Sequence, residues 1–182
     1  MSKAIAVSEY KTVSAGVTAA DAMVKAADVD IVEAATVCPG KYVIIITGEL
    51  SAVKAAAEAG MAAYGEQHIG TFTLGNPHEG IFAAMYGASE VRDLRALGVL
   101  ETFDVASMLV AADNAAKTAD VQLIELRLAR GMCGKSYLML TGEVAAVQAA
   151  IDSAKNTAAQ TGMYLDSSVI ARPDKKLLGS IV

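Results

Sequence analysis

Apolar residues in the first 88 positions follow two patterns, which predict strands and helices in turn. Spacings of three and four place Val17, Ala20, Val24 and Ala27 on one face of a helix. Short runs rich in β-branched residues predict strands between the helices. The strands are predicted at Ile5–Ser8, Val29–Thr36, Tyr42–Thr47 and Ile69–Leu74, and the helices at Ala15–Ala27, Ser51–Ala63 and Glu79–Tyr86.

Local motifs refine these elements. Thr18 stands three residues before Asp21, which predicts a capping-box-like helix start, and Ser51 is expected to cap the next helix. The segment Cys38-Pro39-Gly40 predicts a turn, because proline fixes φ and glycine tolerates positive φ. The resulting order, β-α-β-β-α-β with a short terminal helix, is that of a ferredoxin-like domain.

The second half of the chain repeats the first. Shifts of 92, then 94, then 96 residues superpose Ala19-Ala20-Asp21 on Ala111-Ala112-Asp113, Lys25 on Lys117, Gly40-Lys41 on Gly134-Lys135, Thr47-Gly48-Glu49 on Thr141-Gly142-Glu143, and Pro77 on Pro173. A repeat of this length indicates a duplicated domain. We therefore predict an α+β fold with two ferredoxin-like domains in tandem, residues 1–88 and 97–182, joined by the short connector Gly87–Ala96.

Composition narrows the class of protein. Hydrophobic residues make up 54% of the chain, which argues against disorder. The net charge of −5 comes without a basic stripe, so we expect no nucleic acid partner. The start of the chain predicts no secretory signal, and the longest apolar run, Tyr42–Ile46, predicts no membrane span. Two cysteines are expected to be reduced thiols or metal ligands.

These motifs occur in the same order in both repeats. In this arrangement the sequence resembles the tandem-domain shell proteins of bacterial microcompartments, across essentially the whole chain. The residues that carry the resemblance are Val7-Ser8-Glu9, Ala20-Asp21-Ala22-Met23-Val24-Lys25-Ala26-Ala27, Gly40-Lys41, Thr47-Gly48-Glu49, Gly134-Lys135 and Arg172-Pro173. The resemblance implies two shell domains per chain and a cyclic homotrimer that imitates a hexamer. It also implies that such tiles lie edge to edge with other shell tiles, in a compartment shell in the cytoplasm.

The resemblance also implies tile-edge contacts. Lys25 and Lys117 match the family's edge lysine, and Arg172 matches its edge arginine. The first repeat departs from the family here, since Asn76 precedes Pro77 where an arginine would stand. The alternative for both lysines is a solvated helix face.

In this family the loop before Gly40-Lys41 surrounds the central pore. Here it resembles the loop of propanediol-utilization shells, in which one cysteine per chain ligates an iron–sulphur cluster on the three-fold axis. The resemblance implies Cys38 as the metal and cofactor ligand of one 4Fe-4S cluster per trimer, since three symmetry copies supply three thiolates. The cluster would pass electrons across the shell, with an encapsulated redox enzyme as a further partner, or be delivered through the shell. The alternative is an inert buried thiol.

The pore loops are predicted to include Val37, Pro39, Gly40, Met132, Cys133 and Gly134. Backbone N–H groups at Gly40 and Lys41 are expected to donate to the cluster's sulphur atoms. Cys133 is either a second pore-facing thiol or, as we prefer, a small core residue.

Three functions follow from these observations. The chain is a shell tile with a redox centre, a plain tile whose pore conducts metabolites, or a soluble trimeric sensor of a small ligand. We do not expect an enzyme, because the duplicated Glu9 and Glu101 have no catalytic partner at consistent spacing.

Overall fold

The computed structural model describes residues 4–91, 94–174 and 176–177. Contacts divide the chain into two compact units, Met1–Pro77 and His78–Val182. Each unit is a four-stranded antiparallel sheet with two long helices. None of the helices in the described part of the chain has the length and apolar character needed to cross a membrane.

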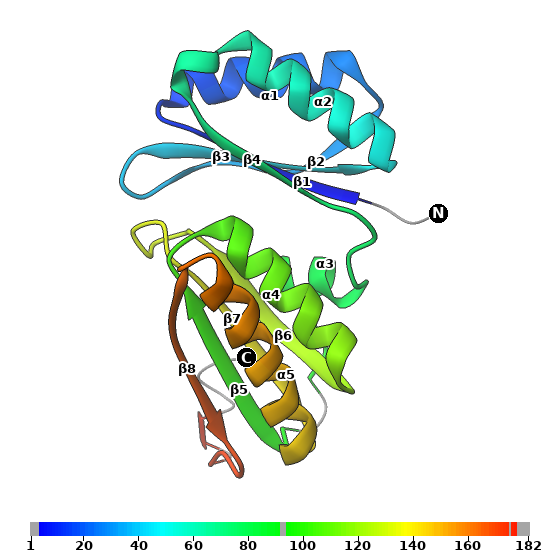
Figure 1. Ribbon diagram of the computed structural model, residues 1–182, viewed down its shortest axis with the longest axis vertical. Coiled ribbons are helices and arrows are strands. Elements are labelled where there is room, and N and C mark those ends of the chain that lie inside the picture. Colours follow the sequence, from blue (N-terminus) through cyan, green and yellow to red (C-terminus); the bar gives the residue numbers. More distant parts are fainter. Residues whose placement is uncertain (1–3, 92–93, 175, 178–182) are drawn as a thin grey trace. The chain divides into compact units, whose positions relative to one another are not determined.

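The first unit contains β1 (Ala4–Tyr10), α1 (Val13–Ala26), β2 (Val29–Val37), β3 (Lys41–Gly48), α2 (Leu50–Ala63), a 3₁₀ turn (Gly65–Gln67) and β4 (His68–Leu74). Its strand order is β2-β3-β1-β4. Both helices cover the same face of the sheet (Figure 1). This order and these crossovers confirm the predicted ferredoxin-like α+β fold.

The second unit contains α3 (Gly80–Met85), β5 (Ala96–Thr102), α4 (Val105–Thr118), β6 (Val121–Leu128), β7 (Ser136–Gly142), α5 (Val144–Gln160) and β8 (Tyr164–Ile170). Its strand order, β6-β7-β5-β8, reproduces that of the first unit. The register is also conserved between the repeats, because Gly48 faces Val29 and Ala4 just as Gly142 faces Val121 and Ala96.

The short helix α3 packs in the second unit, although it closes the first repeat in the sequence. It contacts β6 and, less extensively, α4. The boundary between compact units therefore falls between Pro77 and His78. The predicted ranges 1–88 and 97–182 describe the sequence repeat and stay a prediction. In the second repeat the expected terminal helix is described only at residues 176–177, and the rest of it lies outside the described residues.

Two predicted helix caps are wrong. α1 begins at Val13, and Thr12 caps it by accepting a hydrogen bond from Ala15 N. Thr18 lies inside α1, where its Oγ1 donates to the Ser14 carbonyl. α2 begins at Leu50, after Glu49, so Ser51 is already in the first turn. The Cys38–Gly40 turn is confirmed.

The two cores fill equivalent positions with different side chains. In the first unit Ala6 on β1 and Ala57 on α2 are both buried. Their equivalents are Gly98 and Ile151, and a Cβ added to Gly98 would lie 2.8 Å from Ile151 Cγ1. A larger residue on the helix is thus accommodated by a smaller one on the strand, which keeps the packing dense.

Candidate functional site

The loop between β2 and β3 holds the first predicted pore residues. Cys38-Pro39-Gly40 forms a tight turn with a cis Cys38–Pro39 peptide bond. Gly40 has φ of 109°, a conformation that a residue with a side chain rarely adopts. Cys38 is half-buried, whereas Pro39 and Gly40 are exposed. The Cys38 thiol is therefore partly accessible at the end of a two-stranded ribbon, and the expectation of a buried thiol in the alternative does not hold within this chain.

The base of this loop is held by an ion pair. Lys41 Nζ lies 3.1 Å from Glu9 Oε2, and the Glu9 side chain is mostly buried. Since β1 and β3 are neighbours in the sheet, this pair ties the start of β3 to the end of β1. Glu9 thus has a structural partner in the sheet.

The equivalent loop of the second unit is shaped differently. Ala129, Gly131, Cys133 and Gly134 all have positive φ. The Ser136 hydroxyl accepts a hydrogen bond from Ala129 N, and Lys135 N donates to the Met132 carbonyl. Met132 is half-buried. The longer loop therefore needs several left-handed residues to return to β7.

Three expectations about these loops need correction. Cys133 is exposed, so the preferred interpretation of it as a small core residue is wrong. Val37 is buried, so its side chain does not line an open loop surface. Gly40 N donates to the Val37 carbonyl at 2.9 Å, which leaves that N–H unavailable to a sulphur atom.

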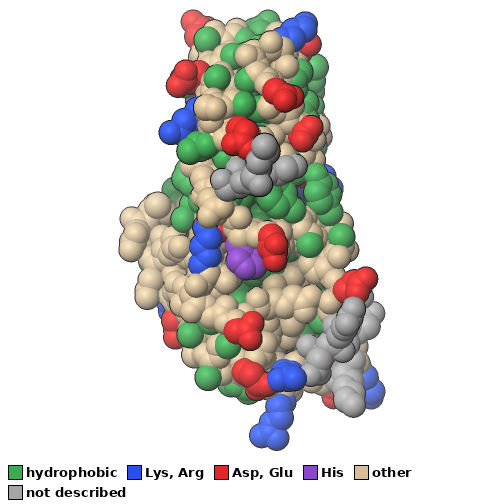
Figure 2. All heavy atoms as spheres, turned by 90° about the vertical axis from the view of Figure 1, so that its right-hand side faces the viewer, with side chains coloured by type: hydrophobic (Ala, Val, Ile, Leu, Met, Phe, Trp, Pro, Cys, Tyr) green, Lys and Arg blue, Asp and Glu red, His purple; other side chains and the backbone are tan. Residues whose placement is uncertain are grey.

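The predicted edge residues lie on equivalent positions of the two repeats. Lys25 Nζ contacts Asp21 Oδ2 at 2.6 Å, and Lys117 Nζ contacts Asp113 Oδ2 at 2.7 Å. Both pairs join residues four apart, and each lysine lies in the last turn of its helix. A cation at this end also interacts favourably with the helix dipole. Arg172 is exposed just after β8. In Figure 2, acidic and basic side chains are interspersed over the described part of the face that is shown.

A polar cluster lies beside the loop between β6 and β7, and no sequence motif predicted it. Tyr137 Oη donates to Glu125 Oε2 at 2.7 Å, and Arg127 binds the other carboxylate oxygen at 2.6 Å. Burial, and then the hydrogen bond to Glu125, raises the pKa of Tyr137 to about 12. The hydrogen bond to Glu125 is also the main cause that raises the pKa of Arg127. The three residues come from β6 and the facing β7, so only the sheet register reveals them.

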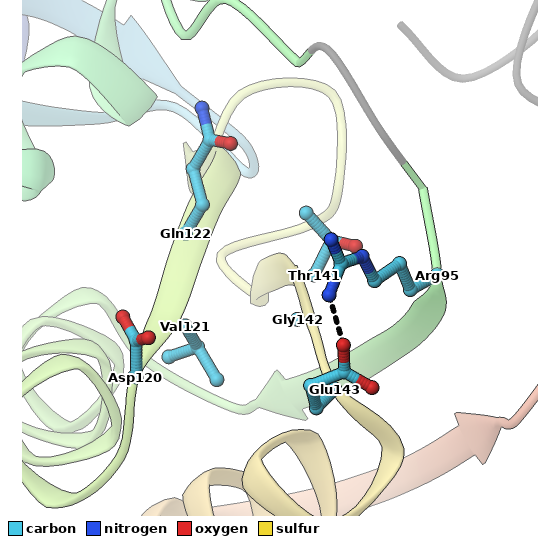
Figure 3. A pocket seen from close by; sticks show the side chains of 7 residues that line it. All are labelled: Arg95, Asp120, Val121, Gln122, Thr141, Gly142 and Glu143. Carbon is cyan, nitrogen blue, oxygen red and sulfur yellow. Dashed lines mark hydrogen bonds and ion pairs between the residues drawn. The ribbon is translucent and has the colours of Figure 1, made fainter.

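The second unit also has an open hollow of about 320 Å³ (Figure 3). It is lined by Arg95, Asp120, Val121, Gln122, Thr141, Gly142 and Glu143. Arg95 and Glu143 form an ion pair across it, and Gln122 donates to the Glu90 carbonyl at 2.8 Å. The charge of the arginine is therefore compensated within the hollow, and its described lining offers no nucleophile–base pair for catalysis.

Among the described residues, no three of the His, Cys, Asp and Glu side chains come together as a metal site. The fit of Cys38 to a cluster is therefore a question of whether it can act as one ligand of a site shared between chains. A partly accessible thiol at the tip of a ribbon fits such a shared site, because the ligand extends away from its own core.

A family model described as the BMC domain matches residues 4–77 and 96–173. The chain is 34% identical to the bacterial microcompartment shell protein PduT of Citrobacter freundii, over 100% of this chain and 99% of that protein. It is also similar to the crystal structure of a microcompartment protein from Desulfitobacterium hafniense DCB, with a TM-score of 0.95, 40% identity, and coverage of 98% and 99% of the two chains. The fused permuted hexameric shell protein of the RMM microcompartment shares the fold, with a TM-score of 0.60 and 21% identity over 87% of this chain and 82% of that one.

Proposed function

Since the chain belongs to the BMC-domain family and is a tandem-domain shell protein of bacterial microcompartments, we propose that it forms a homotrimeric tile with an iron–sulphur cluster at its centre. Cys38 of each chain would be the protein ligand, and the cluster would be of the 4Fe-4S type, one per trimer. The full-length similarity to a shell protein supports a structural role and not an enzyme, and it disfavours the small-ligand sensor.

The observation that carries the proposal is the placement of Cys38. One thiol per chain, half-buried at the tip of the β2–β3 ribbon, is held by a turn whose base is fixed by the Glu9–Lys41 pair. In the proposed trimer, three symmetry copies of Cys38 would supply the three thiolates that one such loop per chain cannot supply alone. A bound cluster would supply one-electron transfer at the tile centre.

The residues around Cys38 have separable tasks in this proposal. Pro39 and Gly40 give the ribbon its tight end and leave the thiol accessible. Glu9 balances the charge of Lys41, so the base of the ribbon adds no net charge where three thiolates would gather.

The test is an anaerobic purification followed by a visible spectrum and iron and sulphide analysis. We expect a brown trimer with about four iron atoms for three chains, as a 4Fe-4S cluster requires. Cys38→Ser should remove the colour and iron, whereas Cys133→Ser, a change at the exposed thiol of the second loop, should retain both. A colourless wild-type trimer after anaerobic reconstitution would leave the plain tile with a metabolite pore as the function.

A further inference from the structure

The start of α3 is held to the second unit through His78. The backbone N–H of His78 donates to Asp113 Oδ1 on α4 at 2.8 Å, and its carbonyl accepts from Ile81 N at 3.0 Å. The imidazole closes the turn, because its Nδ1 accepts a hydrogen bond from Gly80 N at 3.2 Å. His78 therefore joins the α3 segment to α4 through its backbone and holds the first turn of α3 through its ring.

The ring can make this contact in one protonation state. A backbone N–H can only donate, so Nδ1 of His78 must carry a lone pair and the proton of the neutral imidazole must lie on Nε2. A second proton would place an N–H on Nδ1, directly against the N–H of Gly80, and the hydrogen bond would be lost. The ring also lies close over the backbone, since a Cβ added to Gly80 would lie 3.2 Å from Nδ1.

The charged groups around this turn belong to α4 and to the α3 segment itself. Asp113 is 5% exposed, and its other carboxylate oxygen contacts Lys117 Nζ at 2.7 Å. Glu79 is exposed. β6, which also packs against α3, places the apolar Leu123 here. The carboxylate of Asp113 attracts a proton on the ring and the ammonium of Lys117 repels it, so their effects oppose each other. The protonation states therefore differ mainly in the hydrogen bond from Gly80 N.

The second repeat closes the equivalent turn with a group that does not titrate near neutral pH. In the alignment of the repeats, Asp174 takes the place of His78. Asp174 Oδ1 accepts from Lys176 N at 2.8 Å, and the Asp174 carbonyl accepts from Leu177 N at 2.9 Å. Aspartate remains a charged acceptor down to about pH 4. Both repeats thus place an acceptor at this turn, and in the first repeat the acceptor is one that a proton removes.

His68, the other histidine of the chain, makes a contact that protonation does not break. Its Nε2 lies 2.8 Å from Thr71 Oγ1. A hydroxyl can either donate or accept, so it keeps a hydrogen bond with either form of the imidazole. His68 therefore provides a matched comparison for His78.

We propose that His78 is a proton-sensitive latch, which holds the first turn of α3 when its imidazole is neutral and loosens it when the imidazole is charged. Histidine side chains gain a proton as the pH falls from about 8 to about 5. The latch is closed above this range and opens as the pH falls through it. Opening separates the His78 N–H from Asp113, which is also the partner of Lys117, and uncovers Leu123 on β6. The inference goes beyond the proposed function, because it involves neither Cys38 nor a cluster.

Hydrogen exchange of the full chain tests the latch. The protection of the α3 amides, Ile81 N among them, is measured at about pH 7.5 and about pH 5.5, on either side of the usual titration of histidine. Each value is corrected for the intrinsic exchange rate. We expect protection in the wild type to fall about fivefold at the lower pH, the change in an opening equilibrium when one hydrogen bond is lost. Light scattering at both pH values checks that the oligomeric state is the same.

Two variants identify the group responsible. His78→Asn keeps an acceptor oxygen at the turn but cannot gain a proton in this range, so its α3 protection should be equal at the two pH values. His68→Asn is the matched control and should retain the wild-type change. Wild-type protection that does not depend on pH would overturn the inference, and so would a pH dependence that persists in His78→Asn.

Imidazole NMR gives a test that does not require His78 to be replaced. The chain has two histidines, so isotope-labelled histidine gives two sets of ring signals, and His68→Asn assigns them. At about pH 7.5 we expect His78 to be neutral, with its proton on Nε2. A proton on Nδ1 at this pH contradicts the latch, even if His78→Asn does not fold.

Discussion

Gly16 on α1 and Tyr42 on β3 share one space in the core of the first unit. A Cβ added to Gly16 would lie 2.3 Å from Tyr42 Cδ1, inside van der Waals contact. In the second unit the equivalent residues are Met108 and Ser136, both fully buried. The large residue of the pair lies on the strand in the first unit and on the helix in the second. The combined volume of the two side chains is therefore maintained between the repeats, although neither residue is.

This exchange leads to a prediction of non-additive stability. Gly16→Met should lower the free energy of unfolding by about 2 kcal/mol or more, because overpacking forces the Tyr42 ring out of place. Adding Tyr42→Ser should recover part of that loss, although the hydrogen bond from Tyr42 Oη to the Ala34 carbonyl is then gone. Urea unfolding of the single and double variants measures the coupling.

The control for this pair is Gly65→Ala, since a Cβ added at Gly65 meets nothing within 4 Å. It should change stability by less than about 0.5 kcal/mol. Strict additivity of Gly16→Met and Tyr42→Ser would contradict the shared-space interpretation.

Tyr10 leads to a prediction about alkaline pH. Among the described residues, its hydroxyl is the buried side-chain group without a hydrogen-bond partner, and burial raises its pKa from 10.0 to about 12. The folded state thus holds this proton more tightly than the unfolded chain, so the contribution to stability is complete below pH 10 and is lost as the pH rises to about 12. The loss from this residue should be about 2 kcal/mol.

Tyr10→Phe is the variant that isolates this effect. At neutral pH it should leave stability unchanged or raise it by about 1 kcal/mol, because the removed hydroxyl is buried without a partner. Between pH 10 and 12 its unfolding midpoint should fall less steeply than that of the wild type. The raised pKa of Tyr137 leaves a residual slope in both proteins. Parallel pH profiles for the two proteins would show that Tyr10 does not titrate in this range.

At the scale of elements, periodicity located the helices and strands but not their first residues. The α1 helix is confirmed, but of the face predicted from Val17, Ala20, Val24 and Ala27 only Ala20 is buried, whereas Val17 and Val24 are exposed. Its start was ambiguous because Thr12 and Thr18 are both chemically suitable caps. Thr18 has an acid three residues later, which favoured it, but the helix extends through it because the α1–α2 packing buries residues before it, such as Ala15. Cap choice is thus decided by tertiary contacts that a local motif does not contain.

The caps can be compared by alanine substitution. Thr12→Ala should lower the free energy of unfolding by about 1 kcal/mol, because Ala15 N loses its acceptor. Thr18→Ala and Ser51→Ala, at exposed positions inside α1 and α2, should each change it by less than about 0.5 kcal/mol. Thermal unfolding monitored by circular dichroism measures all three. A larger loss for Thr18→Ala than for Thr12→Ala would contradict the assigned cap.

The packing partner of α3 and the exposure of Cys133 also escaped prediction. A helix of six residues has too short an apolar pattern to indicate which sheet it covers, and α3 follows β4 yet packs on β6. Cys133 was weighed as a small apolar side chain, but its positive φ and its loop expose it. In contrast, the turn at Cys38 was predictable, because proline and glycine restrict the backbone locally.

At the scale of the whole molecule, the duplication gives each chain two versions of every surface. Lys25 and Lys117 occupy equivalent places, but the Lys25 side chain is the more exposed of the two. The first repeat also has Asn76 where the second has Arg172. A trimer of such chains would therefore alternate two kinds of edge.

This edge arrangement yields a prediction about sheets of tiles. Lys25→Ala combined with Lys117→Ala should leave the trimer intact in light scattering and abolish flat sheets in electron micrographs of concentrated protein. The exposed Lys25–Asp21 pair stabilises its helix by only about 0.5 kcal/mol. The buried Asp113 keeps the hydrogen bond from His78 N when Lys117 is replaced, so folding should persist. Lys54→Ala on α2 removes an exposed lysine away from these positions and should leave the sheets unchanged. Sheets that form equally well from the double variant would place the tile edge elsewhere and leave both lysines as part of a solvated helix face.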